Sequence, residues 1–145
     1  MSKHGRNRAA GKAPCMIFPC GFMDGASRFM TAGVGFCIFI NESHHLDFPL
    51  WVGHGTNTKA ELLSLWALLQ AAHMMGIPLV QVYGDSTVII NWAIGSTVLS
   101  PPDLRHWGRE TKNLIGSFKD LSFSHIYREH NRLDDSLLKS TLSYP

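Results

Sequence analysis

A chain of 145 residues with 45% apolar side chains is long enough to form one domain with a buried core. No uncharged apolar stretch reaches the ~18 residues that a membrane-spanning helix needs, so we expect no membrane partner. Three cysteines without a CxxC spacing argue against a disulfide framework and a zinc site. They favour a reducing, intracellular location, in the cytoplasm or the nucleus.

The net charge of +2 is unevenly distributed. Residues 1–14 carry four basic and no acidic side chains, whereas the rest of the chain has nine basic and eleven acidic residues. We predict a disordered basic tail over residues 1–14, followed by one domain over residues 15–145. The domain is therefore not a broadly basic nucleic-acid binder. The tail is either a solubilising leader or an electrostatic tether to a polyanion.

The predicted elements begin with three strands. Their segments are CMIFPCGFM, interrupted by Pro19, AGVGFCIFI, and HLDFPLWVG, in which Pro49 argues for an edge position. Because the links between them are short, these strands predict an antiparallel meander. The spacing of the apolar residues then changes from that of a strand to that of a helix. Residues 58–75 are apolar on most sides and predict a largely buried helix, which ends at Gly76 and Pro78.

The second half alternates between strands and helices. LVQVYGD is a nearly continuous apolar strand of the kind covered on both faces, and STVIINWAIG is a short helix. Pro101 and Pro102 open a helix that runs to about Phe118. LSFSHIYRE alternates as a strand, and NRLDDSLLKSTL is a closing helix. This order predicts an α/β fold with a five-stranded mixed sheet, an antiparallel three-strand meander plus parallel strands, flanked by helices.

Four carboxylates fall where a predicted strand ends or a predicted helix begins. They are Asp24, Glu61, Asp85 and Asp135. Each has an ordinary explanation on its own, as a turn residue, a capping-box partner or a helix-capping charge. Jointly, four such coincidences among only 11 acidic residues favour one site for divalent metal ions.

The motifs FMDGAS followed by AGVGF, TNTKAEL, VYGDS and REHNRLDDSL together resemble the ribonuclease H domain family. The closest match is the compact variant found in plant retroelement-derived reading frames, and the resemblance covers residues 16–142. It implies a ribonuclease H-like fold and the metal ligands Asp, Glu, Asp and Asp in that order. By motif these ligands are Asp24, Glu61, Asp85 and Asp135. Related exonucleases and integrases place their acids differently.

The resemblance implies a metal-dependent endonuclease that hydrolyses the RNA strand of RNA–DNA hybrids. Two Mg²⁺ ions, with Mn²⁺ as a substitute, would bind at the four carboxylates and clamp the attacking water and the leaving 3′-oxygen. His130 is left outside the catalytic set. The candidate contacts to nucleic acid are Asn57, Gly25, Ser86, Arg105 and Arg109. The two arginines share a helical face with Lys112 and Lys119. A solvated face explains this spacing, and a stripe that contacts phosphates is the alternative.

Two other functions stay open. A catalytically weakened, retroelement-derived module would bind hybrid or RNA without efficient cleavage, as Met30, Asp134 and the acidic domain would favour. A decaying retroelement remnant would fold without a selected role. The complete set of four acids favours the enzyme, which we expect to be a monomer and a fragment of, or a partner to, a reverse-transcriptase polyprotein.

Overall fold

The computed structural model describes residues 18–29, 33–51 and 57–126. In chain order, its elements are β1 (Cys20–Phe29), β2 (Gly33–Asn41), β3 (His44–Trp51), α1 (Asn57–Met74), β4 (Gln81–Gly84), α2 (Thr87–Ala93), the 3-10 helix η1 (Pro102–Leu104), α3 (Arg105–Ser117) and β5 (Ser122–His125). The predicted tail and the predicted closing helix, with Asp135 and His130, lie outside these residues. None of the described helices is long and apolar enough to cross a membrane.

The five strands form one sheet in the order β3-β2-β1-β4-β5. β1 pairs antiparallel with β2, and β2 pairs antiparallel with β3. β4 lies parallel to β1, and β5 lies parallel to β4. The predicted meander and the predicted parallel strands are therefore confirmed. β3, the strand that contains Pro49, lies at an edge as expected, and β1 joins the two halves of the sheet.

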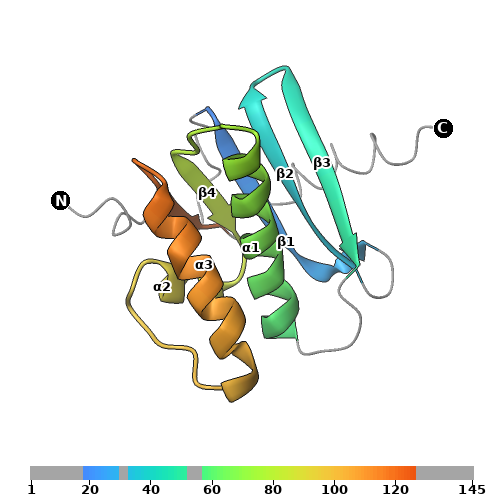
Figure 1. Ribbon diagram of the computed structural model, residues 1–145. Coiled ribbons are helices and arrows are strands. Elements are labelled where there is room, and N and C mark those ends of the chain that lie inside the picture. The colour runs from blue at the N-terminus through green and yellow to red at the C-terminus, as the bar shows by residue number, and fades with distance from the viewer. Residues whose placement is uncertain (1–17, 30–32, 52–56, 127–145) are drawn as a thin grey trace.

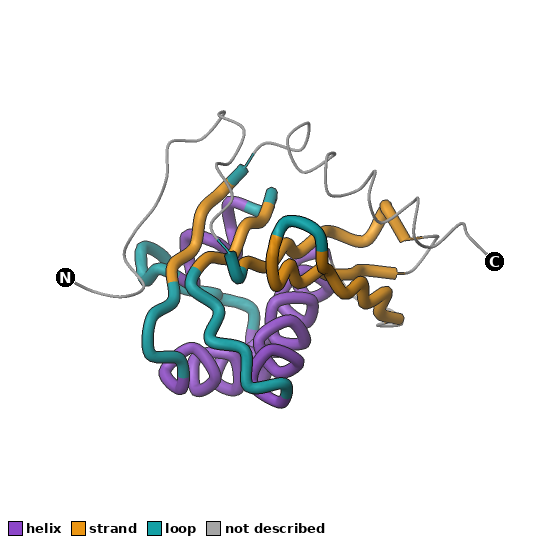
Figure 2. The backbone as a smooth tube through the Cα atoms, turned by 90° about the horizontal axis from the view of Figure 1, so that it is seen from above, coloured by secondary structure: helices purple, strands orange, loops and turns teal. Residues whose placement is uncertain are grey.

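Helices α1 and α3 lie on one face of this sheet, as Figure 1 shows from the front and Figure 2 from above. Helix α1 packs on β1 and β2 and lies beside α3. Each fully buried leucine of α1 contributes about 1.5–3 kcal/mol to stability. These leucines are Leu62, Leu65, Leu68 and Leu69. The helix comes closest to the sheet at Gly21, where a Cβ atom would lie 2.9 Å from Cδ1 of Leu68.

A second apolar cluster lies on the opposite face of the sheet, because side chains alternate along a strand. It contains Phe22 of β1 and Tyr83 of β4, whose stacked rings have centroids 4.9 Å apart. Both side chains are buried, as are all four residues of β4. The central strands are thus covered on both faces, which explains the continuous apolar run of β4 in the sequence.

The predicted end of the first strand is wrong. β1 continues to Phe29, so Asp24 lies within a strand instead of at its end. The antiparallel pairing with β2 resumes at Phe29 opposite Gly33, after an irregular stretch, and this extends the strand beyond the predicted turn. The predicted start of the long helix is confirmed to within one residue, since α1 starts at Asn57, and Glu61 lies one turn inside it.

Lys112 of α3 holds the end of α2. Its Nζ donates to the carbonyl oxygen of Trp92 at 2.9 Å and lies 4.7 Å from the centroid of the Trp92 ring. Burial of the ammonium group lowers the pKa of Lys112. A cation at the carbonyl end of a helix is favourable. Lys112 is therefore engaged with α2, which neither a solvated basic face nor a phosphate-contacting stripe had predicted. Trp92 belongs to the core.

Candidate active site

Asp24 and Asp85 occupy matching positions on neighbouring parallel strands. The last residues paired between β1 and β4 are Met23 and Gly84. Asp24 and Asp85 each follow one of them directly. Because paired strands lie about 4.8 Å apart, the two acids start from adjacent backbone positions. The structure thus brings together two acids that are separated in the sequence by β2, β3, α1 and β4.

A buried hydrogen bond brings the Glu61 turn of α1 to the same place. Ser64 Oγ donates to the carbonyl oxygen of Gly35 at 2.8 Å, and Ser64 is fully buried. Gly35 is the antiparallel partner of Asp24. Glu61, which is half-buried, precedes Ser64 by three residues, or almost one helical turn. The hydrogen bond therefore fixes this part of α1 against the backbone pair that contains Asp24.

Replacing Ser64 by Ala should lower the free energy of unfolding by about 1–2 kcal/mol, because the buried carbonyl oxygen of Gly35 loses its donor. Ser117→Ala is the matched control. Ser117 Oγ also donates to a carbonyl oxygen, that of Leu114, but the bond is exposed, so its loss should change stability by no more than about 0.5 kcal/mol. Urea denaturation measures both. Equal stability of the two variants would show that the Ser64 bond does not anchor α1.

The turn that carries Asp85 is tightly fixed. Gly84 has no room for a side chain, since a Cβ atom would lie 2.9 Å from Cγ of Met23 and 3.3 Å from Cδ1 of Ile90. After Asp85, Ser86 caps α2 by accepting a hydrogen bond from the Ile89 amide at 3.3 Å. Gly84 and Ser86 therefore constrain the backbone on both sides of Asp85.

His125 is a site residue that the sequence analysis missed. It is the last residue of β5 and pairs with Gly84, and its Nε2 lies 3.2 Å from the carbonyl oxygen of Asp85. In the sequence, the one feature that points to His125 is its place at the carboxyl end of a predicted parallel strand. That signal does not select it from its neighbours, because periodicity leaves the strand register open.

The donor chemistry of this end of the sheet fits a hard divalent cation. Carboxylate oxygens are the preferred protein ligands of Mg²⁺ and are also suited to Mn²⁺. Oδ2 of Asp85 is buried. Burial of a carboxylate oxygen is costly, and a bound cation would offset that cost. Of the four predicted ligands, only Glu61 and Asp85 have described side chains, and no group of three or more His, Cys, Asp or Glu side chains that could hold a metal is found among the described residues.

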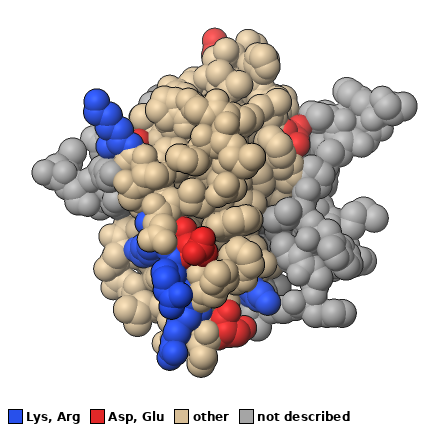
Figure 3. Space-filling view, viewed as in Figure 1, with Lys and Arg blue, Asp and Glu red and all other residues tan. Residues whose placement is uncertain are grey.

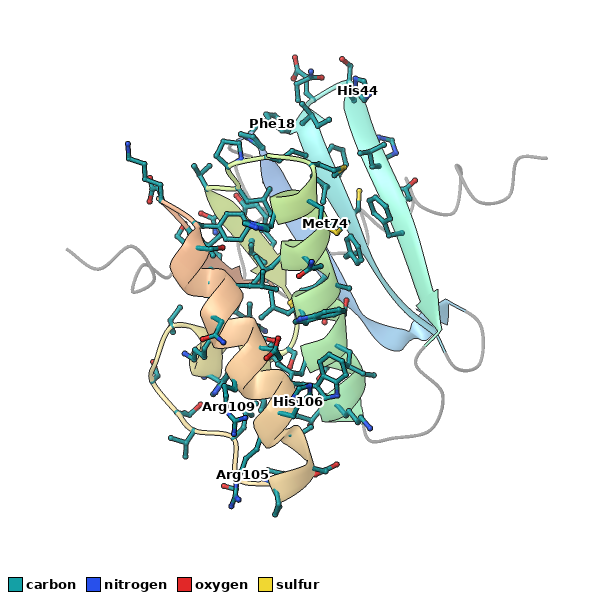
Figure 4. All side chains as sticks on the ribbon, in the orientation of Figure 1. Phe18, His44, Met74, Arg105, His106 and Arg109 are labelled. Atoms are coloured by element: carbon teal, nitrogen blue, oxygen red, sulfur yellow. The ribbon has the colours of Figure 1, made fainter. Side chains whose placement is uncertain are left out.

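Three predicted nucleic-acid contacts lie close to these acids along the chain. Gly25 follows Asp24 in β1, Asn57 is the first residue of α1, and Ser86 follows Asp85. Arg105 and Arg109 lie apart from them, exposed on the first turns of α3, where Figure 4 labels both. In Figure 3, acidic groups interrupt the basic groups in this part of the surface. The two arginines therefore form a small local basic patch on a mixed surface.

Comparison with known proteins gives a match over most of the chain. Residues 38–141 match a family model described as Reverse transcriptase-like. Ribonuclease HI of Halobacterium salinarum is 32% identical over 124 residues, which are 83% of this chain and 62% of that protein. The chain thus spans less than two thirds of the length of this relative.

Solved structures agree with this match. RNase H1 from the halophilic archaeon Halobacterium salinarum has a TM-score of 0.70 and 27% identity, covering 86% of this chain and 98% of that chain. LC11-RNase H1, solved in complex with an RNA/DNA hybrid, has a TM-score of 0.67 and 26% identity, covering 86% and 99%. The fold and the resemblance predicted from the motifs are confirmed. The chain belongs to the ribonuclease H domain family.

Proposed function

We propose that this domain is a metal-dependent endonuclease that hydrolyses the RNA strand of RNA–DNA hybrids. The observation that carries the proposal is the convergence of acids from three elements. Asp24 and Asp85 follow the last paired residues of β1 and β4, and the Ser64 bond holds the Glu61 turn against the partner of Asp24. The relative named Ribonuclease HI and the structure of LC11-RNase H1 with an RNA/DNA hybrid support the reaction and the substrate class.

In this proposal, Asp24, Glu61, Asp85 and Asp135 hold two Mg²⁺ ions, for which Mn²⁺ can substitute. Divalent ions bound there supply an activated water and charge stabilisation at the leaving 3′-oxygen. Asp24, Glu61 and Asp85 would provide negative charge from β1, α1 and the turn after β4. Carboxylates gathered at one site repel each other, so the site is less stable without a cation, and metal binding contributes to folding.

The proposed substrate contacts form two groups, one near the acids and one further from them. Gly25, Asn57 and Ser86 are proposed to contact the hybrid beside the reacting phosphate. Arg105 and Arg109 are proposed to contact backbone phosphates further away, which would position the duplex without reading its sequence. The 2′-hydroxyl is present only in RNA, so contacts to it would decide which strand is cut.

The proposal includes the setting of the domain. We expect a monomer inside the cell, in the cytoplasm or the nucleus, derived from a retroelement and associated with a reverse-transcriptase polyprotein. The description of the matching family as Reverse transcriptase-like supports the retroelement origin.

The test is cleavage of a hybrid labelled on its RNA strand by the purified full chain. We expect cleavage in Mg²⁺ or Mn²⁺, none after chelation, and none of duplex DNA of the same sequence. A chain that binds the hybrid but cuts it in neither metal would refute the enzyme and support the non-catalytic binding module.

A further inference from the structure

His125 reaches the active-site turn from the neighbouring strand. β5 lies parallel to β4, with Gly84 opposite His125, and the amide of Ile126 donates to the carbonyl oxygen of Gly84 at 2.9 Å. The half-buried ring of His125 lies beside the next carbonyl, with Nε2 3.2 Å from the oxygen of Asp85. A carbonyl oxygen can only accept, so Nε2 must carry the proton of this hydrogen bond.

The register that places His125 there is fixed by buried polar groups. Gln81 Nε2 donates to Ser124 Oγ at 2.8 Å, and Ser122 Oγ lies 2.9 Å from Gln81 Oε1. All three residues are buried. A shift of β5 by one residue would turn Ser122 and Ser124 away from Gln81 and leave its amide without these partners, which is costly in a buried setting. The pairing of His125 with Gly84 is therefore strongly specified.

Three contacts hold the backbone around Asp85. Gly84 is confined between Met23 and Ile90, Ser86 caps α2, and His125 binds the carbonyl of Asp85 itself. The first two contacts act on the neighbours of Asp85, and only the third acts on its own peptide group. Holding that peptide group in place also holds the Cα atom of Asp85, from which the carboxylate side chain starts.

We infer that His125 is a positioning residue for Asp85. The Nε2–H group of His125 holds the peptide that follows Asp85, and this fixes the backbone position from which the Asp85 carboxylate would reach the proposed metal ions. The inference rests on the proposed function for its catalytic consequence. The hydrogen bond and its effect on the turn do not depend on that function.

Replacing His125 by Gln or by Asn distinguishes the effect of its hydrogen bond from the effect of its ring volume. In His125→Gln the side-chain amide nitrogen can reach the place of Nε2, whereas in His125→Asn it reaches only as far as Nδ1. We expect His125→Asn to weaken Mn²⁺ binding to the substrate-free protein and to lower kcat, each by about 10-fold, with KM for the hybrid nearly unchanged. His125→Gln should restore most of both. His44→Asn, on an exposed histidine at the opposite end of the sheet (Figure 4), should change neither.

A spectroscopic measurement on the metal-free protein makes the test independent of activity. The carbonyl ¹³C resonance of Asp85 should move in His125→Asn and return toward its wild-type position in His125→Gln. The inference is overturned if this resonance, Mn²⁺ affinity and kcat are all unchanged in His125→Asn, or if the Gln variant is as defective as the Asn variant. If the resonance behaves as expected but wild-type protein neither binds Mn²⁺ nor cuts hybrid, the proposed function fails and the positioning contact stands.

Discussion

Replacing Asp85 by Asn is expected to lower the proposed metal-dependent hydrolysis of hybrid RNA by more than about 100-fold, since loss of a proposed direct metal ligand should exceed the effect of losing a residue that only supports one. Asn preserves the size of the side chain and one acceptor oxygen, but it removes the negative charge that binds a divalent cation. The measurement is kcat/KM in Mg²⁺ and in Mn²⁺, with circular dichroism to verify the fold.

Asp120→Asn is the matched control for this prediction. Asp120 is exposed and precedes β5, so it lies at the end of the parallel strands opposite to Asp85. The same chemical change there should leave kcat/KM unaltered. If the wild-type protein cleaves hybrid and Asp85→Asn keeps most of that activity, the metal site lies elsewhere.

Replacing Gly84 by Ala should reduce the free energy of unfolding by about 2–3 kcal/mol, because the added methyl group enters a filled space. Its Cβ would lie 2.9 Å from Cγ of Met23 and 3.3 Å from Cδ1 of Ile90, and both side chains are buried. Relief of this contact requires the β4 end to move, and Asp85 moves with it. We therefore also expect weaker Mn²⁺ binding.

Gly116→Ala separates this steric effect from the general effect of adding a methyl group to glycine. A Cβ at Gly116 in α3 has no heavy atom within 4 Å outside its own helix. This change should stabilise the protein by about 0.4–1 kcal/mol, because Ala restricts the unfolded chain. Chemical denaturation gives both values. A Gly84→Ala variant as stable as wild type would show that the β4–α2 turn is more compliant than its packing indicates.

The arrangement of the sheet could be predicted because it follows from local patterns. Short links between alternating strands predict the meander, and a continuous apolar strand predicts parallel, doubly covered neighbours. The end of β1 could not be predicted in this way. Gly25 after Asp24 suggests a turn, but the strand continues because β2 offers further pairing partners beyond the irregular stretch.

The candidate site was predictable in its residue types and less so in its supporting contacts. The types and order of the acids are visible along the chain, and the spatial relation of Asp24 to Asp85 follows once β1 and β4 are paired. His125 depends on the β4–β5 register, which buried polar groups set across the strands. Lys112 has the sequence spacing of a solvated basic residue, yet its Nζ donates a hydrogen bond to the carbonyl oxygen of Trp92 in α2. Such contacts join distant segments, so no local pattern reveals them.

The pairing of β1 with β4 has a consequence for the order of folding. The meander of β1, β2 and β3 can form from neighbouring segments, whereas β4 reaches β1 only after α1 has closed a long loop. Non-local pairing of this kind is slow, because the entropy of loop closure is lost before the contacts form. A growing or partly folded chain that has only its meander therefore holds Asp24 without Asp85. Asp24 and Asp85 come together in the step that completes the sheet, so a half-folded chain would lack the proposed metal site.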